Sequence, residues 1–77
     1  SPDGSIRQIP TKRRKFEAVL RYVVQAFEPG RRYTEKEVNE ILEQYNEDTA
    51  VLRRGMVDRE MMSREPDGSL YWLTPSE

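Results

Sequence analysis

Two clusters of basic residues suggest the chemistry of this sequence. Four consecutive cations run from Lys12 to Lys15, and Arg53 and Arg54 are adjacent further along the chain. Lysine and arginine neutralise nucleic-acid phosphates, and arginine also pairs with guanine through two hydrogen bonds in the major groove. Both clusters therefore point to a polyanionic partner. The full set of candidate nucleic-acid contacts is Lys12, Arg13, Arg14, Lys15, Arg31, Arg32, Thr49, Arg53, Arg54 and Arg64.

Each cluster also has a purely structural interpretation. The first is compatible with a solvated helix end, although four cations at a helix N-terminus oppose the helix dipole. Arg53 and Arg54 are placed equally well to bridge to acids such as Glu43 or Glu47. Tyr71 and Trp72 fall on opposite faces of a strand and are expected to form core and rim rather than a platform for stacking bases.

Acidic residues are segregated from the basic ones. Residues 11–34 contain seven basic residues and two acidic ones. Residues 35–50 contain six acidic residues and one lysine. Glu37, Glu40 and Glu43 follow one another at three-residue spacing within the acidic half. Their favoured interpretation is a solvated helix face. They are also candidates for contact with a basic protein partner, and carboxylates at this spacing are able to bind a hard cation.

Composition excludes several function classes. The 77 residues allow one domain at most, and they contain no cysteine and no histidine. The commonest general base and the commonest metal ligands are therefore missing, and no glycine-rich phosphate loop is present. We expect no enzyme, no cofactor, no metal site and no membrane partner, because no apolar run approaches the roughly 20 residues that cross a bilayer.

The overall charge does not by itself favour DNA. The formal net charge is -1 and the isoelectric point is about 5.5, whereas dedicated DNA-binding domains often exceed about 9. The segregation of charge still leaves one face able to meet phosphate. The cysteine-free, charge-rich composition fits a cytoplasmic protein, and a start at Ser1 fits a processed or excised piece of a longer one.

A first helix is predicted after a tail or linker that spans residues 1–10. Thr11 is expected to cap this helix and Pro29-Gly30 to end it. Its apolar residues recur at the spacing of one helix face, and they are Phe16, Val19, Leu20, Val23, Val24 and Phe27.

A second helix is predicted by Thr34 and Glu37, which have the spacing of a capping box. Val38, Ile41 and Leu42 continue its apolar face, and the helix is expected to run to about Tyr45.

A third helix is predicted from Thr49 to about Arg59, with Asp48 as its cap. Leu52 and Met56 form its apolar side, and Gly55 should weaken it by about 1 kcal/mol relative to alanine. The residues expected to point outward are Thr49, Arg53 and Arg54.

A β-hairpin is predicted at the end of the chain. Residues 61–65 and 69–73 alternate as strands, and Pro66-Asp67-Gly68 between them is turn chemistry. Arg32 and Tyr33 predict a short extended stretch before the second helix. The order helix, short strand, helix, helix, strand, strand is that of a winged helix. The sequence therefore predicts an α+β winged-helix domain over residues 11–75.

The sequence also resembles a small bacterial family known only as a domain of unknown function. The resemblance covers about residues 12–73, and this chain has Glu60-Met61 where members tend to have glycine and leucine. The matching residues are Tyr33-Thr34-Glu35, Glu37-Val38-Asn39, Leu52-Arg53-Arg54, Val57-Asp58, Arg64, Asp67-Gly68 and Tyr71-Trp72. Members occur alone or appended to transcriptional regulators of the MerR type or the arsenical-repressor type, which implies a role near transcription.

Two functions follow as hypotheses. The first is a winged-helix domain of a bacterial transcriptional regulator that binds double-stranded DNA through the third helix and the basic end of the first. The alternative is a regulatory or interaction domain that does not bind DNA and instead contacts a protein partner or forms a homodimer.

Overall fold

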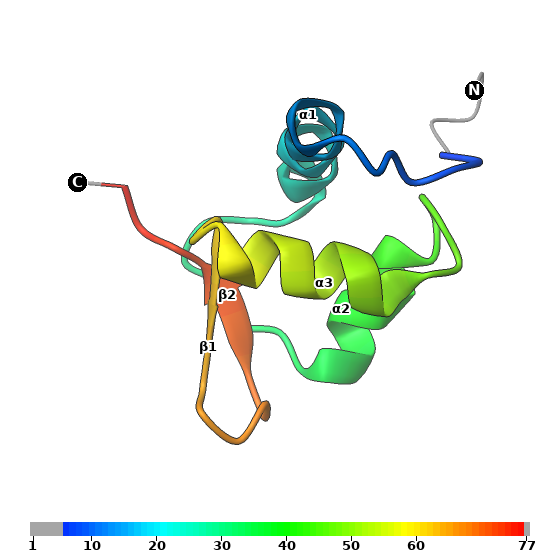
Figure 1. The fold of residues 1–77 in the computed structure, drawn as a ribbon. Helices are drawn as coiled ribbons and strands as arrows, with labels where there is room; N and C mark the ends of the chain where they lie inside the picture. Colours follow the sequence, from blue (N-terminus) through cyan, green and yellow to red (C-terminus); the bar gives the residue numbers. More distant parts are fainter. Residues whose placement is uncertain (1–5, 77) are drawn as a thin grey trace.

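The computed structural model describes residues 6–76, which form helices and one β-hairpin (Figure 1). Within these residues the elements are α1 (Arg13–Val23), the 3₁₀ turn η1 (Val24–Ala26), α2 (Glu35–Leu42), α3 (Thr49–Asp58), β1 (Met62–Arg64) and β2 (Tyr71–Leu73). The predicted α+β class is therefore confirmed, with three α-helices followed by a two-stranded antiparallel hairpin.

Helix α1 presents the predicted apolar face, but its two ends differ from expectation. The N-cap is Lys12 rather than Thr11, and no side chain accepts a hydrogen bond from the first turn. A lysine side chain has no acceptor atom, so the cap is left open. At the other end the α-helix stops at Val23 and tightens into η1 before the turn at Gly30, whose φ is 82°.

Helix α2 begins with the predicted capping box. The Thr34 hydroxyl accepts a hydrogen bond from the Glu37 backbone N–H at 3.1 Å, and the Glu37 carboxylate accepts one from the Thr34 N–H at 2.9 Å. The helix ends at Leu42 rather than near Tyr45, because the chain tightens: the Tyr45 N–H donates to the Leu42 carbonyl, three residues back. This turn leaves the Tyr45 ring edge-on to Tyr22, with centroids 5.7 Å apart.

Helix α3 has a defined cap at each end. At its start Asp48 accepts a hydrogen bond from the Val51 N–H, as predicted. At its end Met61 N–H donates to the Met56 carbonyl at 2.9 Å and Glu60 N–H donates to Val57 at 3.0 Å, which is a Schellman motif. Glu60 has φ of 60°, the left-handed conformation that glycine adopts without strain. The glycine that the sequence comparison leads us to expect at this position would therefore fit the same conformation without strain.

The hairpin is shorter than predicted, with three residues in each strand. Its register pairs Met62 with Leu73 and Arg64 with Tyr71. The outer edge of β2 gains one further partner, because Tyr33 and Tyr71 exchange backbone hydrogen bonds of 2.8 and 2.7 Å. The predicted extended stretch before α2 is thus anchored to the hairpin.

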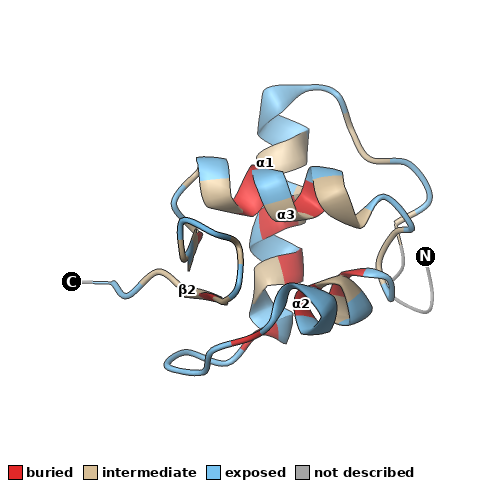
Figure 2. Cartoon of the chain, turned by 90° about the horizontal axis from the view of Figure 1, so that it is seen from below, coloured by how far each residue is buried: buried red, intermediate tan, exposed pale blue. Residues whose placement is uncertain are grey.

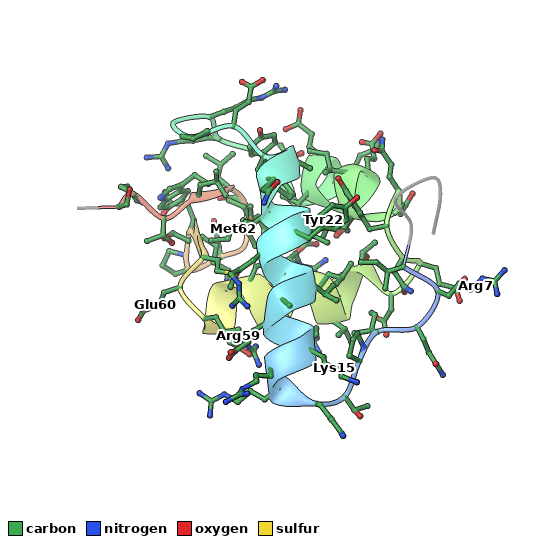
Figure 3. The ribbon with its side chains drawn as sticks, turned by 90° about the horizontal axis from the view of Figure 1, so that it is seen from above. Arg7, Lys15, Tyr22, Arg59, Glu60 and Met62 are labelled. Carbon is green, nitrogen blue, oxygen red and sulfur yellow. The ribbon has the colours of Figure 1, made fainter. Side chains whose placement is uncertain are left out.

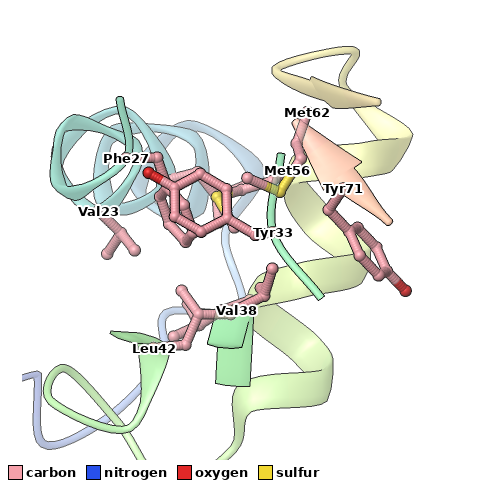
Figure 4. Close-up of a cluster of buried hydrophobic side chains, with 10 residues drawn as sticks. Val23, Phe27, Tyr33, Val38, Leu42, Met56, Met62 and Tyr71 are labelled. Atoms are coloured by element: carbon pink, nitrogen blue, oxygen red, sulfur yellow. The ribbon is translucent and has the colours of Figure 1, made fainter. Parts of the chain in front are cut away.

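The core lies where the three helices and the hairpin meet (Figure 4). Its buried side chains are Leu20, Val23, Phe27, Tyr33, Val38, Leu42, Leu52, Met56, Met62 and Tyr71. Buried positions lie on the inward sides of the helices, whereas their outer sides are exposed (Figure 2). Gly55 belongs to the inward side of α3, where Phe16 and Leu20 of α1 occupy the space next to it.

The predicted tail falls partly outside the described residues, since residues 1–5 are not described. The remainder contacts the connection between α2 and α3. Ile6 N–H donates to the Tyr45 carbonyl at 2.6 Å, and the Asn46 amide donates to the Ile6 carbonyl at 2.6 Å. Ile6 and Ile9 also lie against the core.

Candidate nucleic-acid interface

Arg53 lies in a network of two hydrogen bonds and one ion pair that joins three elements. From α3 its Nη1 donates to the Asn39 Oδ1 of α2 at 2.5 Å, and its Nε lies 3.7 Å from Glu35 Oε1 at the start of α2. The same Glu35 oxygen accepts a hydrogen bond of 3.0 Å from the Tyr71 hydroxyl of β2. The Arg53 side chain is only 15% exposed. The prediction that it points outward is therefore wrong, because α2 supplies acceptors on that side of α3.

The network changes the acidity of Tyr71. Burial of the phenol raises the pKa of Tyr71 above its ordinary value of 10.0, and the hydrogen bond to the Glu35 carboxylate raises it further. Both effects penalise the phenolate form. Tyr71 therefore stays protonated at neutral pH and acts as the hydrogen-bond donor of the network.

A shallow cleft of about 350 Å³ separates α3 from the hairpin. Arg54 is exposed beside it, and the opposite wall carries Arg64, whose Nη1 donates to the carbonyls of Glu65 and Pro66 and so holds the turn. The cleft is lined by Glu35, Arg53, Arg54, Val57, Asp58, Arg64, Pro66, Asp67, Gly68 and Tyr71. The lining contains three arginines and three acidic residues, so its formal charges cancel. Arg54 is the exposed arginine that α3 contributes to it.

The basic cluster at the start of α1 is exposed at every position from Lys12 to Lys15. Arg13 forms an ion pair of 3.3 Å with Glu17, which also accepts a hydrogen bond of 3.2 Å from Arg59 at the end of α3. The hydrogen bond from Arg13, followed by that from Arg59, lowers the pKa of Glu17. Viewed from above, the end of α1 that carries Lys15 projects past α3 on the side away from α2 (Figure 3).

The remaining basic candidates lie elsewhere. The Arg31 guanidinium covers the Tyr33 ring at 4.9 Å, and that of Arg32 covers the Trp72 ring at 4.2 Å while pairing with Glu65 at 3.8 Å. Both arginines thus lie over aromatic rings, and Arg32 also contacts the hairpin. Thr49 is half-buried in the first turn of α3. The structure therefore brings only part of the predicted set together.

The acidic residues of α2 have different environments. The Glu37 carboxylate is engaged in the capping box, where the backbone hydrogen bond from Thr34 lowers the pKa of Glu37. Glu40 and Glu43 are exposed, and no ion pair within residues 6–76 involves them. Within the described residues, Glu40 and Glu43 are thus the exposed acids of α2 that take part in neither an ion pair nor the helix cap.

Sequence reasoning did not find the network around Arg53. Glu43 and Glu47 were the expected bridging acids, but the partner is Glu35, one turn before Asn39 on the same side of α2. The spacing of Glu35 and Asn39 does place them on one helix face. Their pairing with Arg53 depends on how α2 and α3 cross, and no local pattern encodes that angle.

These features define a small α+β domain with a basic end on α1 and an arginine network between α2, α3 and the hairpin. The chain belongs to a family described as an uncharacterized protein conserved in bacteria (DUF2087), whose model matches residues 5–73. The predicted membership of a domain-of-unknown-function family is thus confirmed. Searches of curated proteins and of solved structures each found no match. No helix within residues 6–76 is long and apolar enough to cross a membrane.

Proposed function

We propose that this chain is a winged-helix domain that binds double-stranded DNA as part of a bacterial transcriptional regulator. The order of elements supports the assignment, with the hairpin after α3 as the wing and Tyr33 as the short strand that pairs with it. The connection between α2 and α3 is short, as in helix-turn-helix domains. Helix α3 takes the place of the recognition helix, which enters the major groove in that class.

The observation that carries this proposal is the spatial separation of charge. Helix α3 lies between α1 and the hairpin (Figure 1), and the basic end of α1 projects beside it (Figure 3). Lys12, Arg14, Lys15 and Arg54 are exposed on these two helices, whereas Glu40 and Glu43 belong to α2. A phosphate backbone that runs along α3 meets cations on one side and avoids the acidic helix.

The direct test is fluorescence anisotropy with a labelled duplex of mixed sequence at two salt concentrations. We expect micromolar binding at about 50 mM salt that is largely lost at about 200 mM, because proteins that contact several phosphates lose affinity steeply over this range. Absence of binding at the lower salt concentration would contradict the proposal. An acidic peptide of scrambled sequence, as long as the protein, serves as the control. It shows whether the anisotropy of the labelled duplex changes without specific binding.

A second candidate function has one observation in its favour. Glu40 and Glu43 are exposed and free of ion pairs within residues 6–76, which suits contact with a basic protein partner or a second copy of the chain. Sedimentation at low and high salt distinguishes the cases. Self-association that depends on salt and disappears in a Glu40→Gln/Glu43→Gln variant favours this second function.

A further inference from the structure

Arg53 and Arg54 are neighbours in sequence but have different environments. The Arg53 side chain is 15% exposed and bonded to α2, whereas Arg54 is exposed beside the cleft. An arginine reads a base or binds a phosphate through free guanidinium N–H groups, held in a fixed fork. The Nη1 and Nε atoms of Arg53 are already directed at Asn39 and Glu35. Contact with DNA through these two atoms would require Arg53 to give up these partners.

One partner of Arg53 also contacts the hairpin. Glu35 holds both Arg53 of α3 and Tyr71 of β2, which are joined through a single carboxylate oxygen. The hairpin has only three residues per strand, and a hairpin of this size is marginal unless other elements hold it. Within residues 6–76, the backbone hydrogen bonds between Tyr33 and Tyr71 attach the hairpin to the segment before α2. The network is thus a second attachment at the same residue.

We propose that Arg53 is a positioning residue that fixes the hairpin against α3 through Glu35 and Tyr71, and that Arg54 is the arginine of this pair that contacts DNA. The second part rests on the proposed function, whereas the first part concerns the free protein. Arg53 acts through its neighbours, and removing it moves the hairpin rather than deleting a contact with DNA.

The chemistry of the network permits a charge-swap test. Tyr71 has a hydroxyl that donates or accepts, and Asn39 has an amide that does both. A variant with Arg53→Glu and Glu35→Arg therefore keeps an ion pair and leaves both neighbours with partners. The matched control is Arg53→Gln with Glu35→Gln, which has the same net charge as the parent and the swap but no ion pair. Arg53→Glu alone places two carboxylates together.

Amide hydrogen exchange in the free protein tests the positioning role. We expect Arg53→Glu to accelerate exchange of the Tyr33 and Tyr71 amides by about tenfold or more, the factor that corresponds to losing a charge-assisted hydrogen bond. The amides of α1 should change less. The swap should restore protection, and the neutral control should restore it incompletely. Uniform acceleration across α1 and the hairpin, or no rescue by the swap, would overturn the positioning role.

The duplex assay tests the division between the two arginines. We expect the swap to bind the mixed-sequence duplex within about twofold of the parent, and Arg54→Gln to bind more weakly with a smaller salt dependence. Loss of binding by the swap with hydrogen-exchange protection intact would show that Arg53 itself contacts DNA and would overturn the proposal. If the parent binds no duplex, the proposed function fails, and hydrogen exchange alone decides whether Arg53 positions the hairpin.

Discussion

The edge of the Phe16 ring fills the space next to Gly55, so that a Cβ atom on Gly55 would lie 2.6 Å from the ring. The Leu20 side chain lies 3.0 Å from the same point. The Arg59 guanidinium lies over the Phe16 ring, 4.8 Å from its centroid, and limits the movement of the ring. The glycine that weakens α3 as a helix is therefore what allows α1 to approach it.

Replacing Gly55 with alanine should destabilise the domain despite the better helix propensity of alanine. Overpacking of a core typically costs 1–3 kcal/mol, and the propensity gain of about 1 kcal/mol offsets only part of it. We expect a net loss of about 1 kcal/mol in the free energy of unfolding, measured by chemical denaturation. Phe16→Leu in the same chain should reduce this loss. A Gly55→Ala variant more stable than the parent would contradict the close approach.

Replacing Glu60 with glycine should have the opposite effect. Glu60 has φ of 60° at the end of α3, and the left-handed conformation costs a residue with a side chain roughly 1–2 kcal/mol. Glycine relieves this strain but loses more entropy on folding. We expect a net gain of about 0.5–1 kcal/mol, visible as a higher Tm. Asp58→Gly, at a helical position nearby, is the control and should be destabilising.

Glu17 should make the stability of the domain depend on acid. Hydrogen bonds from Arg13 and Arg59 lower the pKa of Glu17 in the folded state below its ordinary value of 4.5. The stabilising effect of Glu17 is therefore fully present above that ordinary value and is lost as the pH falls through the lowered pKa. Glu17→Gln should be less stable than the parent at pH 7. The two proteins should converge below the lowered pKa of Glu17 when melting is followed from pH 7 to pH 2. A constant difference across that range would contradict the role of the charge.

Asn46 should control the attachment of the segment that precedes α1. Its amide donates to the Ile6 carbonyl at 2.6 Å, while its Oδ1 accepts from the Asp48 N–H at 2.8 Å. Asn46→Asp keeps the acceptor and removes the donor, so only the contact with Ile6 is lost. We expect faster exchange of the Ile6 amide, with α3 remaining capped and the global stability reduced by about 1 kcal/mol. Unchanged exchange at Ile6 would show that Asn46 does not hold the segment.

The cations of α1 should contribute unequally to DNA binding. Lys12 and Lys15 have no ion-pair partner within residues 6–76, whereas Arg13 is paired with Glu17. If Lys12→Gln and Lys15→Gln each remove one phosphate contact, each should lower the slope of log affinity against log salt by about 0.9. Arg13→Gln should lower it less. Equal slopes in all three variants and the parent would place the phosphate contacts elsewhere.

Local sequence patterns predicted the elements of this fold well. The period of α1, the capping box at Thr34 and the cap at Asp48 all depend on residues within one or two turns of each other, and each is found as expected. The boundaries were less predictable. Helix α2 ends early because its last turn tightens. Tyr45 still packs against the core, so the spacing of apolar residues does not reveal where the helix ends.

The candidate site was less predictable than the fold. We expected both arginines of α3 to point outward. Adjacent helix positions differ in direction by about 100°, so a neighbouring helix can cover one arginine and leave the other exposed, but the sequence does not show where α2 lies. The approach of Glu35 and Asn39 leaves the Arg53 side chain only 15% exposed, whereas Arg54 is exposed. Side chains that meet across elements thus carry the information that the sequence pattern lacked.

The pairing of Tyr33 with Tyr71 has a consequence for the order in which the domain assembles. The two helical segments α2 and α3 are close in sequence and can meet early, whereas the Tyr71 hydroxyl reaches Glu35 across 36 residues. Closing such a loop costs entropy before any contact rewards it. Tyr71 also supplies a buried ring of the core. During synthesis, therefore, we expect the helices to remain loosely associated until the hairpin has left the ribosome. Folding of the domain is then completed only after β2 has emerged.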